Sequence, residues 1–330
     1  MTVMLIIIIA FGLIFDFING FHDSANSIAT IVSTKVLTPF QAVLWAGFFN
    51  FVAYFIFRDH KVANTVASIV HPQFVDLRIV IAGLIAAISW NLLTWWFGIP
   101  SSSSHTLIGG FIGAAIAKMG SFDVIVYKNL IKTVSFILLS PLIGMILAFC
   151  ITLIVVWLSR NSHPFKADRW FKRLQLMTSA VFSIGHGGND AQKTMGLIAL
   201  ALTTEHLIPG IKEMPLWVPL TCYVAMGCGT MFGGWRIVKT MGTRITKVTP
   251  LEGVCAETAA ASTLIFTELL GIPVSTTHTI AGSIIGVGAT KRLSAVRWGV
   301  TINLLWAWIL TIPVSALLAA GIYSLMRLFF

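Results

Sequence analysis

The chain has 330 residues, of which 57% are hydrophobic and only 10% are charged, and its mean hydropathy is +0.89. Soluble domains usually carry about a quarter charged residues, so a soluble enzyme is nearly excluded. Apolar runs over residues 3–18, 136–158 and 300–325 reach membrane-spanning length. These features predict an all-α polytopic membrane protein.

The formal net charge of +10 comes from 22 Lys and Arg residues against 12 Asp and Glu residues. The basic residues lie mostly between apolar segments, which argues against nucleic acid as a partner and favours a role in orienting the chain in the lipid bilayer. The four cysteines lie in apolar stretches without paired metal-ligand spacing. Neither a disulfide framework nor a zinc site is therefore expected.

The hydrophobic pattern predicts about ten membrane crossings and, where some are broken or re-entrant, about 10–12 helical segments. The first apolar run lacks a basic leader and a small-residue cleavage site, so we expect a retained transmembrane helix. In chain order, the expected crossings are 2–34, 38–57, 77–97, 102–118, 130–158, 174–204, 216–236, 252–270, 274–290 and 298–326.

The sequence contains an internal duplication. GIPSSSSHTLIGGFIG at 98–113 and GIPVSTTHTIAGSIIG at 271–286 are identical at nine of sixteen positions, and GFHDSAN at 20–26 is echoed more weakly by GGNDAQK at 187–193. We therefore divide the chain into a first repeat (1–159), a short basic linker (160–173) and a second repeat (174–330).

The linker predicts the topology. It holds five basic residues against Asp168 alone, so the positive-inside rule places it in the cytoplasm. Counting outward puts both termini outside, the first GIP turn inside and the second GIP turn outside, in a multi-pass protein of the plasma (inner) membrane. The two repeats then have inverted topology, although several basic residues of the first half lie outside.

The two GIP segments carry features of an anion site. Pro100 favours a helix start, and the residues after it supply hydroxyls and free N–H groups at a helix N-terminus. Serine and threonine can also serve merely as contacts between helices, but interrupted segments in two inverted halves indicate a substrate site near the midplane. The candidate residues are Ser102, Ser103, Ser104, Ser275, Thr276 and Thr277. The G-x-x-x-G spacings at 109–113 and 282–286 are interpreted as helix packing.

Asp23 and Asp190 are carboxylates in apolar surroundings, with amide side chains nearby at Asn26, Asn189 and Gln192. Charge within a membrane is costly and is by default functional. Carboxylate and amide oxygens suit hard cations such as Na⁺, and helix capping is the structural alternative. Each carboxylate would repel a doubly charged anion by about 7 kcal/mol at roughly 5 Å and a dielectric of about 20. We therefore expect anion binding only together with cations.

Other polar residues have open roles. Lys193 stands in the second copy of this weaker repeat where Asn26 stands in the first. Three roles are open for it: a counter-cation for Asp190, a direct contact to the anion, or a lysine that snorkels to the membrane surface. His22 and His186 either relay protons or are hydrogen-bonded structural residues. Glu257 is a further candidate for ion coupling, with a contact to a neighbouring helix as the alternative.

Enzyme classes find little support. The chain has no G-x-x-x-x-G-K-[ST] loop for ATP hydrolysis and no metal-ligand cluster, so active transport would have to be secondary. An intramembrane hydrolase is conceivable from the adjacent Ser and His of SSSSH, but adjacency does not establish an activated pair. We predict that the protein is not an enzyme.

These motifs resemble the inorganic phosphate transporter (PiT) family, and in particular its bacterial branch of low-affinity phosphate permeases. The resemblance covers essentially the whole chain and is carried by GFHDSAN at 20–26, GIPSSSSHT at 98–106, GGNDAQKTMG at 187–196 and GIPVSTTHT at 271–279. The family signature is approximately Gly-Ala-Asn-Asp-x-Ala-Asn. The chain matches it at Asp23, Asn26, Asn189 and Asp190 and departs from it at His22, Gln192 and Lys193.

The resemblance implies a symporter that imports inorganic phosphate with H⁺ or Na⁺ by alternating access, without a cofactor. It also implies a homodimer, and a metal–phosphate complex is an alternative form of the substrate. Asn26, Gln192 and Lys193 join the hydroxyls as expected anion contacts, and Asp23, Asn26, Asn189, Asp190 and Glu257 are the expected coupling residues. A sulfate permease of the same family is the runner-up, followed by an anion channel or exchanger.

Overall fold

The fold is almost entirely helical. In the computed structural model, which describes residues 2–329, the chain forms twelve α-helices joined by short turns, and no strand longer than one bridging pair occurs in this range. The all-α prediction is confirmed. The helices are α1 (Val3–Ser33), α2 (Pro39–Ile56), α3 (Lys61–Ala67), α4 (Leu77–Phe97), α5 (Ser103–Met119), α6 (Tyr127–Ser159), α7 (Pro164–Thr204), α8 (Trp217–Phe232), α9 (Trp235–Lys239), α10 (Pro250–Leu269), α11 (Thr276–Lys291) and α12 (Trp298–Phe329).

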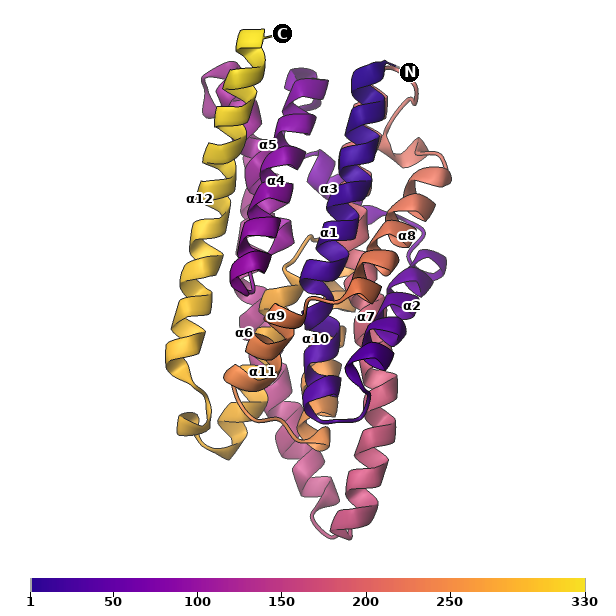
Figure 1. The fold of residues 1–330 in the computed structure, drawn as a ribbon, viewed down its shortest axis with the longest axis vertical. Helices are drawn as coiled ribbons and strands as arrows, with labels where there is room; N and C mark the ends of the chain where they lie inside the picture. The colour runs from indigo at the N-terminus through magenta and orange to yellow at the C-terminus, as the bar shows by residue number, and fades with distance from the viewer. Residues whose placement is uncertain (1, 330) are drawn as a thin grey trace.

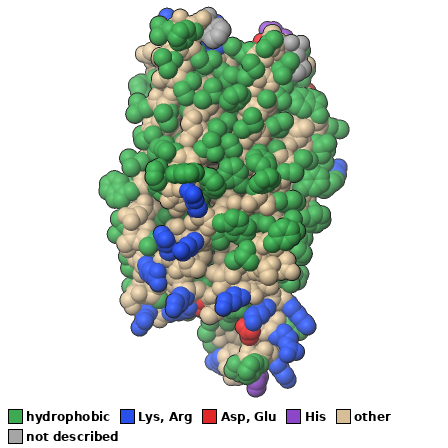
Figure 2. All heavy atoms as spheres, in the orientation of Figure 1, with side chains coloured by type: hydrophobic (Ala, Val, Ile, Leu, Met, Phe, Trp, Pro, Cys, Tyr) green, Lys and Arg blue, Asp and Glu red, His purple; other side chains and the backbone are tan. Residues whose placement is uncertain are grey.

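Four long helices form the frame. Helices α1, α6, α7 and α12 have 31, 33, 41 and 32 residues, so at about 1.5 Å per residue each exceeds the roughly 30 Å hydrocarbon core of a bilayer. They run along the long axis in Figure 1. By length and composition, α1, α2, α4, α6 and α12 are apolar enough to cross a membrane. In Figure 2 apolar side chains dominate the upper part, whereas Lys and Arg gather at the end opposite the termini.

Helix α7 begins earlier than the sequence suggested. It starts at Pro164 rather than at 174, so most of segment 160–173 is helical. Proline fits the first turn of a helix, and Lys172 and Asp168 pair at 2.8 Å one turn apart. The predicted crossing covers only the stretch after Arg173, the last basic residue of the linker, whereas the helix extends back through that linker.

Two helical hairpins turn back inside the molecule. Figure 1 shows α4 and α5 in the half that holds both termini, and α10 and α11 in the other half. Their turns meet: Ser104 Oγ donates to Val274 O at 3.1 Å, and Thr277 Oγ1 donates to Ser101 O at 3.2 Å. The expectation that the GIP turns lie on opposite faces is therefore wrong, because apolar length alone does not distinguish a crossing helix from a re-entrant one.

The two hairpin turns are built alike. Gly98 and Gly271 end α4 and α10 in the left-handed region, with φ of 66° and 63°, where glycine carries no Cβ penalty. The Oγ of Ser102 then accepts from His105 N at 3.3 Å, and Ser275 Oγ accepts from His278 N at 3.2 Å. Ser102 and Ser275 are thus the N-caps of α5 and α11.

Each hairpin packs closely against a long helix of the other half. A Cβ on Gly113 of α5 would lie 2.1 Å from Ala316 O of α12, and one on Gly286 of α11 would lie 2.2 Å from Met145 O of α6. Backbone therefore meets backbone at both contacts. The interpretation of the G-x-x-x-G spacings as packing is confirmed.

Two other expected crossings are broken. Helix α2 ends at Ile56 and is continued by the short α3, and α8 ends at Phe232 and is continued by α9. The broken ends bond to the hairpin turns: Thr65 Oγ1 on α3 donates to Gly271 O at 2.6 Å, and Thr240 Oγ1 after α9 donates to Gly98 O at 3.4 Å. Each hairpin turn is thus held by a broken helix of the other half.

Candidate anion and cation site

The four sequence motifs converge at the hairpin turns. Asp23 of α1 accepts from Ser103 Oγ at 2.8 Å, and Asp190 of α7 accepts from Thr276 Oγ1 at 3.0 Å. All four side chains are buried. Each carboxylate therefore lies beside the first turn of one hairpin.

Asn26 connects the two halves. Its Nδ2 donates to Thr277 Oγ1 at 2.9 Å and lies 3.3 Å from Thr276 Oγ1. Asn26 follows Asp23 by three positions, so both side chains share one face of α1. The amide thus connects the helix that carries Asp23 to the hydroxyls at the start of α11.

Lys193 is fully buried and does not snorkel. Its Nζ donates to Asp190 Oδ1, to Ser104 Oγ and, at 2.8 Å, to Val274 O. A lysine ammonium has three N–H donors, and all three are used. Of the roles left open, the counter-cation for Asp190 is the one that this arrangement provides, and no donor remains for an anion.

Each of the two carboxylates has a histidine beside it. His22 Nδ1 lies 2.6 Å from Asp23 Oδ1, and His186 Nε2 lies 3.3 Å from Asp190 Oδ2. The ligand atoms of Asp23, His186 and Asp190 all lie within 4.8 Å of one another. Two carboxylate oxygens and an imidazole nitrogen around one point offer a place for a cation.

Asn189 positions the second hairpin turn. Its Oδ1 accepts from Val274 N at 3.3 Å, and its Nδ2 donates to Ile272 O at 3.4 Å. Both the oxygen and the nitrogen of the amide therefore bond to the backbone of the turn. In this conformation Asn189 therefore holds the second turn in place, and one lone pair of its oxygen is used for that.

Gln192 lies outside the group of residues at the hairpin turns. Its Oε1 accepts from Val62 N at 3.1 Å and from Ala63 N at 3.4 Å, at the start of α3, and its Nε2 donates to Glu268 Oε1 at 2.5 Å. The expectation that Gln192 contacts the anion is wrong for this conformation. Two positions beyond Asp190 on a helix, its side chain points to a different face.

Glu257 forms a separate cluster. It accepts from Thr30 Oγ1 at 2.6 Å, Gln175 Nε2 at 2.9 Å and Thr178 Oγ1 at 2.5 Å. The donors come from α1 and α7, so this buried carboxylate on α10 joins three helices. It does not bond to Asp23 or Asp190.

Two buried carboxylates were missed in the sequence. Asp16 accepts from Thr194 Oγ1 at 2.5 Å, and Glu268 bonds to Gln192; one oxygen of each has no hydrogen-bond partner in the described structure. Asp16 interrupts the first apolar run, which is the signal that could have identified it. Glu268 gave no comparable signal, because it falls at the end of its helix.

Comparisons with known proteins agree with this geometry. A sequence model described as "Phosphate transporter family" matches residues 19–170 and 159–319. A Rhizobium meliloti protein named "Probable low-affinity inorganic phosphate transporter" is 52% identical over 97% of this chain and 96% of its own length. A Bacillus subtilis protein of the same name is 44% identical over 100% of this chain and 99% of its own. The chain belongs to the phosphate transporter family.

A solved structure supports the family fold. The structure titled "The sodium-dependent phosphate transporter" superposes with a TM-score of 0.88 and 25% identity, covering 100% of both chains. The relatives carry the names of transporters, so the prediction that the chain is not an enzyme is confirmed. Family membership and the apolar helices establish an integral membrane protein.

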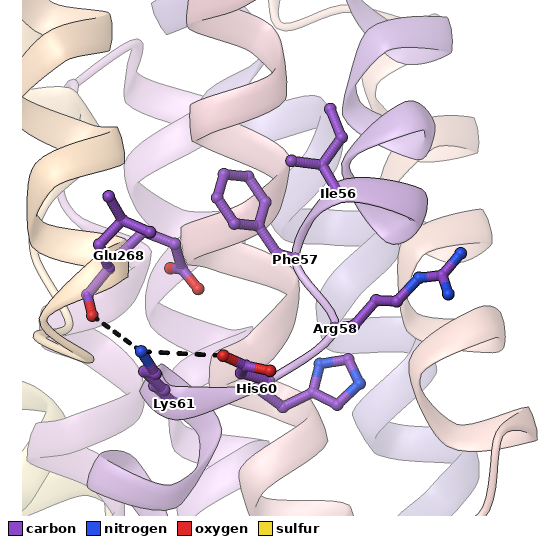
Figure 3. A pocket seen from close by; sticks show the side chains of 8 residues that line it. Ile56, Phe57, Arg58, His60, Lys61 and Glu268 are labelled. Carbon is purple, nitrogen blue, oxygen red and sulfur yellow. Dashed lines mark hydrogen bonds and ion pairs between the residues drawn. The ribbon is translucent and has the colours of Figure 1, made fainter.

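This member of the phosphate transporter family has a hollow lined by charged residues beside each hairpin turn. A pocket of about 160 Å³ lies at the α2–α3 junction, and its charged lining residues are Arg58, Asp59, Lys61 and Glu268. Figure 3 shows the Arg58 side chain pointing away from Glu268, whereas Lys61 lies on the same side as Glu268. Lys61 Nζ donates to Leu269 O at 3.3 Å, just before the second turn. Beside the first turn, a hollow of about 350 Å³ is lined by Trp96, Phe97, Gly98, Arg236, Lys239, Thr240 and Arg244. The hollow beside the first turn therefore presents positive charge, whereas the pocket beside the second turn is lined by two basic and two acidic residues.

Proposed function

We propose that this transporter imports inorganic phosphate together with a cation. The observation that carries the proposal is the pairing of each buried carboxylate, Asp23 and Asp190, with the hydroxyl-bearing first turn of a hairpin helix. Helix N-termini attract anions, whereas the carboxylates repel them. An anion therefore gains from the turns only when positive charge neutralises the carboxylates beside them.

The anion contacts of the proposal are the hydroxyls of Ser103, Ser104, Thr276 and Thr277, with the Asn26 amide beside them. Ser102 and Ser275 contribute as the N-caps that shape the two helix starts. In the conformation described, these hydroxyls donate hydrogen bonds to backbone carbonyls of the opposite hairpin turn or to the two carboxylates. Anion binding would replace part of these bonds with charge-assisted bonds to phosphate oxygens.

Alternating access is proposed to arise from two inverted repeats, 1–159 and 174–330. The support is the like construction of the two turns and the entry of the two hairpins from opposite ends of the molecule (Figure 1). Thr65 bonds one turn and Thr240 the other. Release of one of these bonds at a time would expose the site to one hollow at a time.

The coupling cation is proposed to be H⁺ or Na⁺, bound at the Asp23 and Asp190 motifs, with Glu257 as a further coupling residue. A metal–phosphate complex is the alternative substrate form. The end of the molecule that is basic in Figure 2 is proposed to face the cytoplasm. Both termini are proposed to lie outside the plasma (inner) membrane, and two copies are proposed to form a homodimer.

Proteoliposomes test the proposal. With an imposed H⁺ or Na⁺ gradient, one of the two should drive phosphate accumulation, and excess sulfate should not compete. Strong competition by sulfate would favour a sulfate permease. Phosphate flux that proceeds only downhill, whatever the cation gradient, would contradict symport and favour a channel or exchanger.

A further inference from the structure

The ammonium of Lys193 lies in a nest of three different oxygens. They are the Asp190 carboxylate, the Ser104 hydroxyl and the Val274 carbonyl, contributed by α7 and both hairpins. Carboxylate, hydroxyl and carbonyl oxygens are the ligand types that hard metal cations use. The three N–H donors of the ammonium match these three acceptors. The Lys193 ammonium, which is part of the chain, therefore occupies the place that a bound metal cation could take.

The corresponding place in the first half has no such cation. Asn26 stands where Lys193 stands in the echo, three positions beyond the aspartate in both motifs. The Asn26 amide donates to Thr277, and Asp23 is accompanied by His22 and Ser103 instead of an ammonium. The two carboxylates are therefore unequal: one is neutralised internally by lysine and the other is not.

We infer that Lys193 is a tethered substitute for one transported cation. It occupies the cation place at Asp190, so the exchangeable coupling cation binds on the Asp23 side of the site. Two carboxylates and one ammonium leave a charge of −1 when both histidines are neutral, and one added positive charge neutralises it. The inference rests on the proposed cation-coupled binding of phosphate and specifies how many cations that binding requires.

The test is Lys193→Asn, which gives the second motif the residue of the first. Phosphate binding to the purified protein is measured by calorimetry over a series of Na⁺, Li⁺ or K⁺ concentrations, with choline holding ionic strength constant. The slope of log affinity against log cation concentration counts the cations taken up with phosphate. We expect the slope to rise by about one for at least one of these ions, and the affinity without them to fall about tenfold or more.

Lys172→Asn is the matched control, because Lys172 pairs with Asp168 on the same helix at 2.8 Å but is exposed. Its slope should equal that of the parent. An unchanged slope in Lys193→Asn for all three ions would overturn the inference. Failure of the parent to bind phosphate would instead overturn the proposed function itself, and the inference with it.

Removal of one partner of a buried ion pair can prevent folding. The double variant Asp190→Asn/Lys193→Asn removes both charges and provides a second test. Without the carboxylate, the nest should no longer attract a metal cation, so this variant should bind phosphate with the slope of the parent. A slope that differs from that of the parent by one or more would overturn the inference.

Discussion

Asn26 and Thr277 are 251 positions apart in the chain and share a hydrogen bond of 2.9 Å from Nδ2 to Oγ1. The same threonine hydroxyl donates to Ser101 O at 3.2 Å. One hydroxyl thus links α1, the first hairpin turn and the start of α11. This makes Thr277 the most central of the hydroxyls proposed to bind the anion.

Thr277→Val should weaken phosphate binding while keeping the side-chain shape. A hydrogen bond to a charged ligand is worth roughly 1.5–3 kcal/mol, or about one to two orders of magnitude in affinity. Calorimetric titration with phosphate measures the change. Thr290→Val, near the far end of the same helix, is the control and should bind like the parent. Equal affinities in the two variants would remove Thr277 from the anion site.

Asp23→Asn and Asp190→Asn should each abolish phosphate accumulation against a gradient. Asparagine keeps the size of the side chain but removes the charge that attracts the coupling cation at Asp23 and holds the Lys193 ammonium at Asp190. Uptake into proteoliposomes with an imposed cation gradient is the measurement. Asp123→Asn, in an exposed turn, should behave like the parent. Accumulation at the parent level in both site variants would rule out the coupling role.

Glu257→Gln should raise the cation concentration needed for half-maximal uptake by about tenfold, equivalent to about 1.4 kcal/mol of cation binding. The change removes a charge and turns an amide donor toward the hydroxyls of Thr30 and Thr178, which now donate to the carboxylate. Glu252→Gln, on the same helix, is the control because a glutamine preserves its capping role. A variant that melts earlier but keeps its cation dependence would show that Glu257 is purely structural.

Cysteines at the two ends of α7 should label from opposite sides of the membrane. Lys212→Cys lies in the turn after α7 and Arg169→Cys in its first part; both positions are exposed. In a background without the four native cysteines, a membrane-impermeant thiol reagent added outside intact cells should label position 212 alone. Labelling of position 169 from outside would reverse the proposed orientation.

Gly286→Ala should destabilise the fold by about 1–3 kcal/mol, because the new methyl group would lie 2.2 Å from the backbone oxygen of Met145. Gly321→Ala is the control: Gly321 also lies within a helix, but nothing lies within 4 Å of the added carbon, and helix propensity favours alanine. Thermal melting in detergent compares the two. Equal melting temperatures would contradict the close packing of α11 on α6.

Several helix boundaries could be predicted from hydropathy, and the expected segment 77–97 coincides with α4. Hydropathy could not predict whether this helix crosses the membrane or turns back inside the molecule. Its 21 residues are long enough to cross a bilayer, but its turn at Gly98 contacts a second turn more than 170 positions away inside the molecule. Such a contact is a property of the assembled hairpins and leaves no trace in local composition.

Helical geometry explains which of the predicted site residues lie together in the structure. Lys193 is three positions beyond Asp190 and shares its face of α7, whereas Gln192 is two positions beyond and faces α3. The repeat alignment treated all three as one motif. A rotation of about 100° per residue along the helix would have separated Gln192 from the site. The hydrogen-bond partners of Lys193 could not be predicted in this way, because they depend on where both hairpins lie.

The close packing of α5 on α12 and of α11 on α6 has a consequence for biogenesis. The glycines of the first hairpin pack against α12, which is synthesised last. The hairpin therefore cannot reach its final packing during translation. A polypeptide that ends after α6 lacks α12, so its α5 could pack only against the α12 of another molecule. Separately expressed halves should therefore be unstable alone and stabilise each other when they meet in one membrane.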